Sequence, residues 1–266
     1  ECDERTYNLD PAAVAARLTP RTRAILPIHL YGQTADMEAL SAIAARHGIF
    51  LLEDAAQAHG ARCRGRASGS LGHAAGISFY PSKNLGACAD AGAVTTSDAV
   101  LADRLRHLRN YGARIRYQNE YAGLNSRLGE LQAAFLRAKL PLLSPWNERR
   151  RRLADAYLRD LAGVGDLVLP FVPAWAEPAW HLFVIRTGRR AALQEHLRGA
   201  GVETQIHYPT PPHLSGAYRK AGWKRGDFPV AERLAGEVLS LPLGPHLDSA
   251  QAGHVCASIR NFFKCA

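Results

Sequence analysis

The stretch IFLLED (residues 49–54) is a nearly continuous apolar run that ends on two carboxylates. Such a run is typical of a strand that a parallel sheet buries on both faces. It follows an amphipathic helix that Asp36 caps and Gly48 ends, and before that helix RAILPIHL (residues 23–30) is a second apolar run. We therefore predict a strand–helix–strand unit within an α/β fold whose sheet is mostly parallel.

The remaining sequence continues the alternation of strands and helices. Further strands are expected at residues 76–80, 92–96, 181–186 and 202–206, and helices at residues 98–108, 127–140, 146–161 and 190–197, followed by two C-terminal helices. Ser126 is expected to cap the helix at 127–140, and Pro141 and Pro145 to separate that helix from the next. The proline-bearing stretch 170–178 is typical of a boundary, so we predict a large domain at 1–165 and a small α+β domain at 166–266.

The composition excludes several classes of protein. None of the apolar runs in the 266 residues is long enough to cross a bilayer, and the polar start ECDERTYNLD does not resemble a signal peptide. The five cysteines form no C-x-x-C pair, and the 11 histidines form no H-E-x-x-H pattern. We therefore predict no membrane segment, no disulfide framework and no metal site, which suits a cytoplasmic protein.

The formal net charge of +9 raises the question of an anionic partner such as nucleic acid. The densest basic run, ERRRR (residues 148–152), lies in a predicted helix whose apolar residues recur at helical spacing. Charge runs on such helices usually face water, so we expect these arginines to be solvated. Because no recognised nucleic-acid-binding motif accompanies the run, we predict no nucleic-acid partner.

Two opposite charges stand at the ends of predicted strands. Asp54 lies at the carboxyl end of a buried strand, where open α/β sheets bind their ligands. Lys83, in SFYPSKNLGA (residues 78–87), lies just past the end of another strand. The two side chains are therefore able to converge on one pocket, although a partly buried ion pair or two surface charges would also explain them.

Neighbouring polar residues also have simple structural explanations on sequence grounds. Asp54 has the position of a helix cap, and Gln57 that of an exposed helix residue. Ser78 has the position of a strand serine satisfied by the backbone, and Asn125 that of a polar loop residue. The histidines at positions 59 and 181 are expected to be packed and hydrogen-bonded rather than catalytic.

Several ordered blocks nevertheless resemble one family. LLEDAAQAHGA (residues 51–61), GISFYPSKNLGACADAGAVTT (76–96) and GLNSRLGELQAAFL (123–136) are similar to the DegT/DnrJ/EryC1/StrS family of pyridoxal-phosphate-dependent aminotransferases. The likeness continues through PIHLYGQTADM, IHYPTPPHL, GDFPVAE and LSLPLGP, so that it spans essentially the whole chain. It implies the fold-type-I architecture of aspartate aminotransferase. It also implies transamination of a nucleotide-activated keto-sugar, with glutamate as the amino donor, for polysaccharide or antibiotic sugar biosynthesis.

The resemblance assigns roles to five residues. Lys83 would form a Schiff base with the cofactor aldehyde and then carry a proton between substrate and cofactor. Asp54 would pair with the pyridine nitrogen, and Gln57 would lie near the ring and its phenolic oxygen. Ser78 would bind the cofactor phosphate. Asn125 would reach the phosphate in the neighbouring subunit, which implies a homodimer with shared active sites.

The chain departs from the family pattern in two places. It is expected to lack an N-terminal portion of roughly a hundred residues that supplies a phosphate-binding turn and a ring-stacking aromatic side chain. The usual GDGGA is ADAGA (residues 89–93) here, which would be strained if Ala89 or Ala91 had a positive φ. Two alternatives to the transaminase follow: a noncatalytic or regulatory remnant of the fold, and a cofactor-dependent sugar dehydratase. The dehydratases of the family carry histidine in place of Lys83, so this residue argues against the second alternative.

Overall fold

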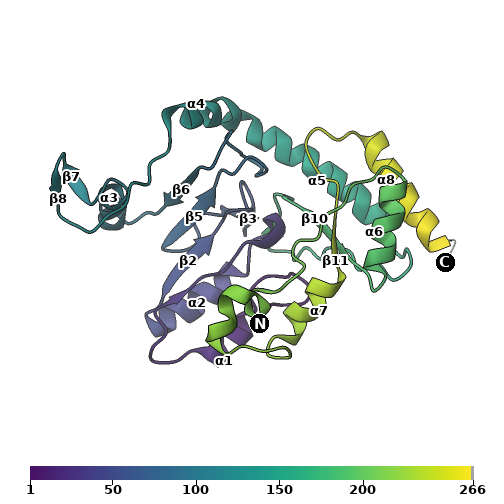
Figure 1. Ribbon diagram of the computed structural model, residues 1–266, viewed down its shortest axis with the longest axis horizontal. Coiled ribbons are helices and arrows are strands. Elements are labelled where there is room, and N and C mark those ends of the chain that lie inside the picture. The colour runs from purple at the N-terminus through teal and green to yellow at the C-terminus, as the bar shows by residue number, and fades with distance from the viewer. Residues whose placement is uncertain (265–266) are drawn as a thin grey trace.

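The computed structural model describes residues 1–264, and its largest sheet has four strands in the order β1-β2-β5-β6 (Figure 1). They are β1 (Ala24–Ile25), β2 (Phe50–Asp54), β5 (Ala74–Ser78) and β6 (Gly92–Thr95). The first three are parallel, and β6 runs antiparallel to β5, which confirms a mostly parallel sheet. The strand predicted at 23–30 is shorter than expected, since β1 has only two residues. The strand predicted at 76–80 begins and ends two residues earlier, as β5. The register pairs Asp54 with Gly76, which places the carboxyl ends of β2 and β5 side by side.

Helix α2 (Met37–His47) connects β1 to β2 as the sequence predicts. The Asp36 side chain accepts a hydrogen bond of 3.1 Å from the backbone N–H of Ala39, and so satisfies a donor that a helix start leaves free. Gly48 ends the helix with a φ of 61°, a left-handed conformation that glycine adopts without a steric penalty. A short helix, α1 (Pro11–Arg17), precedes β1, and two short strands, β3 (Arg62–Cys63) and β4 (Arg66–Ala67), follow β2.

After the sheet, α3 (Ala99–Leu108), β7 (Ala113–Ile115) and β8 (Gln118–Asn119) lie at one end of the long axis, opposite the C-terminus (Figure 1). The chain then returns through α4 (Glu130–Lys139), which lies nearer the middle of the molecule. The prediction that Ser126 caps the last helix is wrong. The backbone N–H of Ser126 donates to Arg109 at 2.9 Å, which ties the chain to the end of α3, and Gly129 is the residue before the helix.

The long helix α5 (Leu143–Asp160) begins three residues earlier than predicted. A 3₁₀ turn, η2 (Leu140–Leu142), joins it directly to α4. Pro145 lies in the first turn of α5, where a backbone N–H has no partner inside the helix, so the proline does not interrupt it.

The C-terminal part of the chain packs in part against α5 and in part against the N-terminal half, where β9 (Ala176–Glu177) pairs with β3. Its further elements are β10 (Phe183–Arg186), α6 (Arg190–Gly199), η3 (Pro212–Leu214), η4 (Gly216–Ala221), α7 (Pro229–Glu237), β11 (Val238–Leu241) and α8 (Ser249–Lys264). β10 and β11 pair antiparallel. The prediction of a strand at residues 202–206 is wrong, because no strand forms there. Val202 is buried, and its N–H donates to Leu197 at the end of α6, so only Gln205 forms an isolated bridge, to Ser240.

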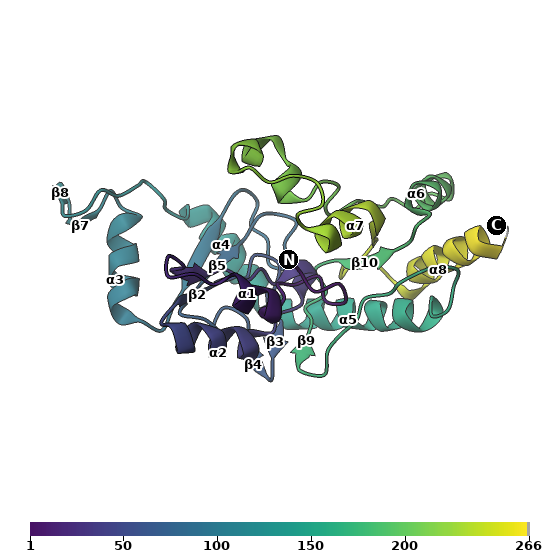
Figure 2. The same cartoon turned by 90° about the horizontal axis from the view of Figure 1, so that it is seen from below.

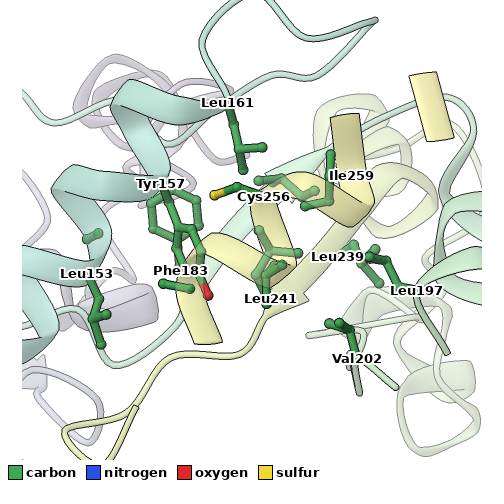
Figure 3. Close-up of a cluster of buried hydrophobic side chains, with 14 of the residues drawn as sticks. Leu153, Tyr157, Leu161, Phe183, Leu197, Val202, Leu239, Leu241, Cys256 and Ile259 are labelled. Atoms are coloured by element: carbon green, nitrogen blue, oxygen red, sulfur yellow. The ribbon is translucent and has the colours of Figure 1, made fainter. Parts of the chain in front are cut away.

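A cluster of buried apolar side chains joins α5 to β10, α6, β11 and α8 (Figure 3). Its fully buried members include Tyr157, Leu161, Phe183 and Ile259. The Tyr157 hydroxyl donates a hydrogen bond of 2.8 Å to the carbonyl of Pro242, so that its one polar atom is satisfied. The view in Figure 2 shows α5 passing from the sheet side of the molecule to these C-terminal elements. The boundary between residues 165 and 166 stays a prediction. In residues 1–264, no helix is both long and apolar enough to span a bilayer.

One buried carboxylate, Glu53, fixes the loop that leads into β5. It is 1% exposed and accepts four hydrogen bonds: from His29 Nε2 at 2.9 Å and from the backbone N–H groups of Gly69, Leu71 and Gly72 at 2.7, 2.6 and 2.7 Å. Burial raises the pKa of Glu53, but hydrogen bonds from His29 and the backbone outweigh it and leave the net pKa below its ordinary value. The depressed pKa means that Glu53 stabilises the fold above its unfolded-state pKa, and that this contribution is lost as the pH falls through the folded-state pKa.

We expect Glu53→Ala to lower the free energy of unfolding by about 3–5 kcal/mol, because four buried or partly buried donors lose their acceptor. Urea unfolding at neutral pH measures the loss. Glu203→Ala is the matched control, since Glu203 is exposed and this substitution should change stability by less than about 0.5 kcal/mol. Equal unfolding midpoints for the two variants would show that the carboxylate is not a stabilising anchor.

Candidate active site

The structure brings Asp54 and Lys83 to the same edge of the sheet. Asp54 ends β2, and Lys83 lies in the turn after β5, where its backbone N–H donates to Tyr80 at 2.9 Å. Burial lowers the pKa of the half-buried Lys83 amine, and the carboxylate of Asp54 is near enough to raise that pKa in part. Across residues 1–264, the amine forms no hydrogen bond or ion pair. Lys83 is therefore a desolvated amine beside a carboxylate.

Asp54 and Ser78 each keep hydrogen-bonding capacity. Asp54 Oδ1 accepts a hydrogen bond of 3.0 Å from the N–H of Ala56, while no described residue donates to Oδ2. The hydroxyl oxygen of Ser78 accepts a hydrogen bond of 3.2 Å from the N–H of Tyr80, so its O–H proton remains available to an acceptor. Both side chains are half-buried. The edge thus offers one anionic acceptor and one neutral donor.

Gln57 is buried rather than exposed on a helix, so that alternative is wrong. It is 7% exposed, and its Oε1 accepts a hydrogen bond of 2.6 Å from the N–H of Tyr31. Its Nε2 donates to the hydroxyl of Tyr208 at 3.1 Å, while the hydroxyl of Tyr31 donates to the carbonyl of His207. These bonds connect the sheet edge to the loop that follows residue 206. One N–H of Gln57 remains without a partner within the described residues.

Asn84, next to Lys83, is a site residue that the sequence does not single out. Its side chain is buried and donates to Asn147 Oδ1 at 2.9 Å and to the carbonyl of Ala179 at 2.8 Å. Because both of its N–H groups are used, its Oδ1 must accept the 3.1 Å hydrogen bond from His181 Nδ1–H. Burial lowers the pKa of His181 to about 3, so the ring is neutral. Asn84 thereby anchors the lysine turn to α5 and to the chain before β10.

We expect Asn84→Ala to lower the free energy of unfolding by about 2–4 kcal/mol, because it leaves Asn147, Ala179 and His181 each short of one buried partner. Thermal and urea unfolding measure this effect. Asn261→Ala, at an exposed position of α8, is the matched control and should stay within about 0.5 kcal/mol of the unchanged protein. A loss no greater than the control's would contradict the anchoring role.

The expectation that the ERRRR run is solvated fails at Arg150, which is buried. Its Nη1 lies 3.3 Å from the carbonyl oxygens of Trp180 and His181 and 3.1 Å from that of Leu243. Burial lowers the pKa of Arg150 to about 10. Helical spacing could have predicted this burial. Arg150 precedes Leu153, Ala154 and Tyr157 by three, four and seven residues, so it lies on the same face of the helix as these buried residues.

His59 and the ADAGA turn also differ from expectation. His59 is packed, but neither of its buried ring nitrogens has a hydrogen-bond partner in the described part of the chain, and burial lowers its pKa to about 4. His181, in contrast, is packed and hydrogen-bonded as expected. Ala89 and Ala91 are not among the residues with positive φ, so the ADAGA turn does not carry the backbone strain that a positive φ at an alanine would cause.

Asn125 lies apart from the other predicted residues. It is exposed in the segment between β8 and α4, forms an isolated bridge with Asn110, and accepts a hydrogen bond of 3.0 Å from Arg127 Nε. Within residues 1–264, no hydrogen bond or β-bridge joins it to Asp54 or Lys83. The same range contains no group of three His, Cys, Asp or Glu side chains able to hold a metal ion, and its four cysteines are free. Cys265 lies outside the described residues.

Comparison with known proteins adds independent findings. The sequence model of the DegT/DnrJ/EryC1/StrS aminotransferase family matches residues 1–260. The chain is 57% identical, over 96% of its length and 70% of the relative's, to the erythromycin biosynthesis sensory transduction protein EryC1 of Saccharopolyspora erythraea. It is 53% identical, over 96% of its length and 67% of the relative's, to the dTDP-3-amino-3,4,6-trideoxy-alpha-D-glucose transaminase of Streptomyces venezuelae. The crystal structure of S. venezuelae DesV in complex with a ketimine intermediate superposes with a TM-score of 0.97 at 52% identity, covering 99% of this chain and 71% of that one.

Proposed function

Because this chain belongs to the DegT/DnrJ/EryC1/StrS aminotransferase family, whose enzymes depend on pyridoxal phosphate, we propose that it transfers an amino group to a keto group of a nucleotide-activated sugar. The relatives support this function: the S. venezuelae protein is named as a transaminase of a dTDP-sugar, and another relative, 44% identical, as a UDP-sugar aminotransferase of Acidithiobacillus ferrooxidans. They disfavour the alternative of a noncatalytic remnant. The retained Lys83 disfavours a dehydratase.

The observation that carries the proposal is that Lys83 and Asp54 lie at the same sheet edge, near enough for the carboxylate to act on the amine without an ion pair in the described residues. The donor set there fits the cofactor: an amine without a partner, a carboxylate with one free oxygen, and a serine with a free O–H proton. When bound, pyridoxal phosphate supplies an aldehyde for the amine and a ring that withdraws electrons from the reacting carbon.

Each residue has one task in this proposal. Lys83 would hold the cofactor through its aldehyde, and its neutral amine would take the proton from the substrate carbon and return it on the cofactor side. Asp54 would face the pyridine nitrogen and favour its protonated form. Ser78 would offer its free O–H proton to the phosphate. Gln57, which Tyr31 and Tyr208 hold on either side, would offer its remaining N–H to the phenolic oxygen.

We further propose glutamate as the amino donor and the cytoplasm as the setting, which the free cysteines suit. Production of 2-oxoglutarate tests the function directly. The purified chain is incubated with pyridoxal phosphate, glutamate and a panel of dTDP- and UDP-linked 3-keto-sugars. Keto-sugar-dependent formation of 2-oxoglutarate is the expected result. Binding of the cofactor without turnover on any keto-sugar would instead support the noncatalytic alternative.

Asn125 is proposed to act in the neighbouring subunit of a homodimer, which its exposure and its lack of a hydrogen bond to Asp54 or Lys83 in the described residues favour. Mixing two inactive variants tests this. Lys83→Ala and Asn125→Ala subunits, refolded together in equal amounts, should recover about a quarter of the unchanged activity, since half of the dimers then carry one intact site. Each variant refolded alone is the control. If the mixture is no more active than the two controls, the site is not shared through Asn125.

A further inference from the structure

One side chain of α5 joins the two segments that carry the predicted cofactor residues, the loop after β2 (residues 54–61) and the lysine turn (residues 78–88). Asn147 is 7% exposed, and its Nδ2 donates a hydrogen bond of 2.7 Å to the backbone carbonyl of His59 in the loop. Its Oδ1 accepts the 2.9 Å hydrogen bond from Asn84 in the turn. In the part of the chain that the structure describes, no other side chain is hydrogen-bonded to both segments. We call this pair of hydrogen bonds the amide bridge.

The loop after β2 is rigid enough to carry the position of His59 back to Asp54. Its backbone forms two consecutive turns, in which Ala58 donates to Ala55 and Ala61 donates to Ala58, both at 3.0 Å. Ala58 and Ala61 are fully buried. Because a buried, close-packed and hydrogen-bonded segment has few alternative conformations, a restraint at one end acts along its whole length.

The loop and the amide also fit closely. A Cβ atom at Gly60 would lie 2.7 Å from Asn147 Nδ2, and the φ of Gly60 is +83°, so glycine is required for this approach. An asparagine amide presents its donor and its acceptor in one rigid plane. It therefore fixes the separation of a carbonyl on one side and an N–H on the other, while α5 holds the amide itself in place.

We propose that Asn147 is a positioning residue, which sets the separation between the Asp54 carboxylate and the Lys83 amine through the amide bridge. This role in the reaction rests on the proposed function. The interaction between two charges falls with their distance, so the separation decides how strongly the carboxylate favours the protonated amine. It also decides whether the amine is aligned with the reacting carbon, since small displacements of a reacting group lower its rate steeply.

Four titratable groups lie near enough to the Lys83 amine to act on it or respond to it. Asp54 raises the pKa of the amine. For His59, His181 and His207, burial is the largest cause that lowers the pKa, and the charge of Lys83 lowers it further. These three rings are neutral at neutral pH. Among the four groups, the carboxylate is therefore the one whose charge makes the titration of the amine depend on position.

Titration of Lys83 in the full chain without cofactor tests the amide bridge and needs no turnover. NMR spectra of a sample that contains ¹³C-labelled lysine follow the signal that Lys83→Ala removes. Asp54→Asn should lower the pKa of this amine, because a carboxylate that raises it is lost. When Asn147→Ala is already present, the same Asp54→Asn change should lower it by about half as much or less, since the two groups are no longer held together. The double comparison cancels any change in burial that Asn147→Ala alone causes.

Tyr157→Phe is the matched control, since it removes a buried hydrogen bond from the same helix without touching the amide bridge. It should lower the unfolding midpoint in urea but leave the effect of Asp54→Asn at full size. Asn147→Ser is the second variant, because its smaller side chain leaves less space unfilled than alanine and yet is too short to reach both segments. An undiminished effect of Asp54→Asn in the Asn147 variants, or an equal reduction in Tyr157→Phe, would overturn the positioning role.

Steady-state kinetics then connect the amide bridge to the reaction. Asn147→Ala should lower kcat at least about tenfold and leave the KM for glutamate and for the nucleotide sugar within about twofold, because alignment of the amine changes and substrate binding does not. A raised KM with an unchanged kcat would contradict the proposal. Absence of transamination in the unchanged chain would refute the proposed function alone, because the titration still decides the amide bridge.

Discussion

Replacing Lys83 with alanine is expected to lower the rate of transamination by at least about 10⁴-fold, because no other amine in the site is placed to carry the proton. The fold should survive the change. The Lys83 amine is half-buried and forms no hydrogen bond or ion pair in the described part of the chain, so its removal leaves no partner unsatisfied. Single-turnover measurement of product formation at saturating cofactor gives the rate, and thermal unfolding checks the fold.

Lys220→Ala is the matched control, since Lys220 is exposed in the 3₁₀ segment η4, outside the proposed cofactor site, and its loss should leave the rate within about twofold. Lys83→Arg is a sharper variant. It keeps the positive charge beside Asp54, but a guanidinium cannot release its proton near neutral pH and should be as inactive as alanine. A rate within tenfold of the unchanged protein for either Lys83 variant would remove this residue from the reaction.

The second large effect is expected from Asp54→Asn, with a loss of about 10²–10³-fold in kcat. The amide has the shape of the carboxylate, and its oxygen can still accept the hydrogen bond from Ala56. It cannot, however, keep a pyridine nitrogen protonated, so the electron-withdrawing power of the ring is reduced. Initial-rate kinetics with both substrates saturating measure the loss, and Glu203→Gln serves as an exposed carboxylate control.

Asp54→Asn should also change the titration of Lys83. Burial lowers the pKa of the lysine amine and Asp54 raises it, so removal of the carboxylate should lower that pKa further. The amine acts only when neutral, which means that the acidic limb of the pH–rate profile should move to lower pH. A fall in kcat with no such movement would indicate that Asp54 acts on the cofactor alone, and a movement to higher pH would contradict the electrostatic coupling of the two residues.

Local signals in the sequence predict much of this fold. The cap at Asp36, the left-handed Gly48 and the apolar run that ends at Asp54 are each determined by a few neighbouring residues, and the structure confirms them. The same holds for α3, which Asp98 caps with hydrogen bonds to two backbone N–H groups. The cofactor and the reaction are predicted by the family resemblance and not by these local signals.

Features that depend on distant partners are not predicted. Ser126 has the residue type of a helix cap, but its backbone is bonded to the end of α3. Arg150 has the charge of a solvated residue, yet three carbonyl oxygens from the C-terminal part of the chain surround it. Asn84 is hidden in the same way, since its partners are 63 to 97 positions away in the sequence. A sequence without aligned relatives carries no local signal for such pairings.

The two carboxylates that end β2 have opposite tasks, because successive side chains of a strand point to opposite faces. Glu53 accepts hydrogen bonds from three backbone N–H groups, while Asp54 lies near the amine of Lys83. Insertion or deletion of a single residue within this strand would therefore exchange the two faces and disable anchor and site together. Length changes in this gene should be tolerated in surface turns such as the exposed turn between β3 and β4 long before they are tolerated here, and a library of single-codon insertions would reveal that contrast.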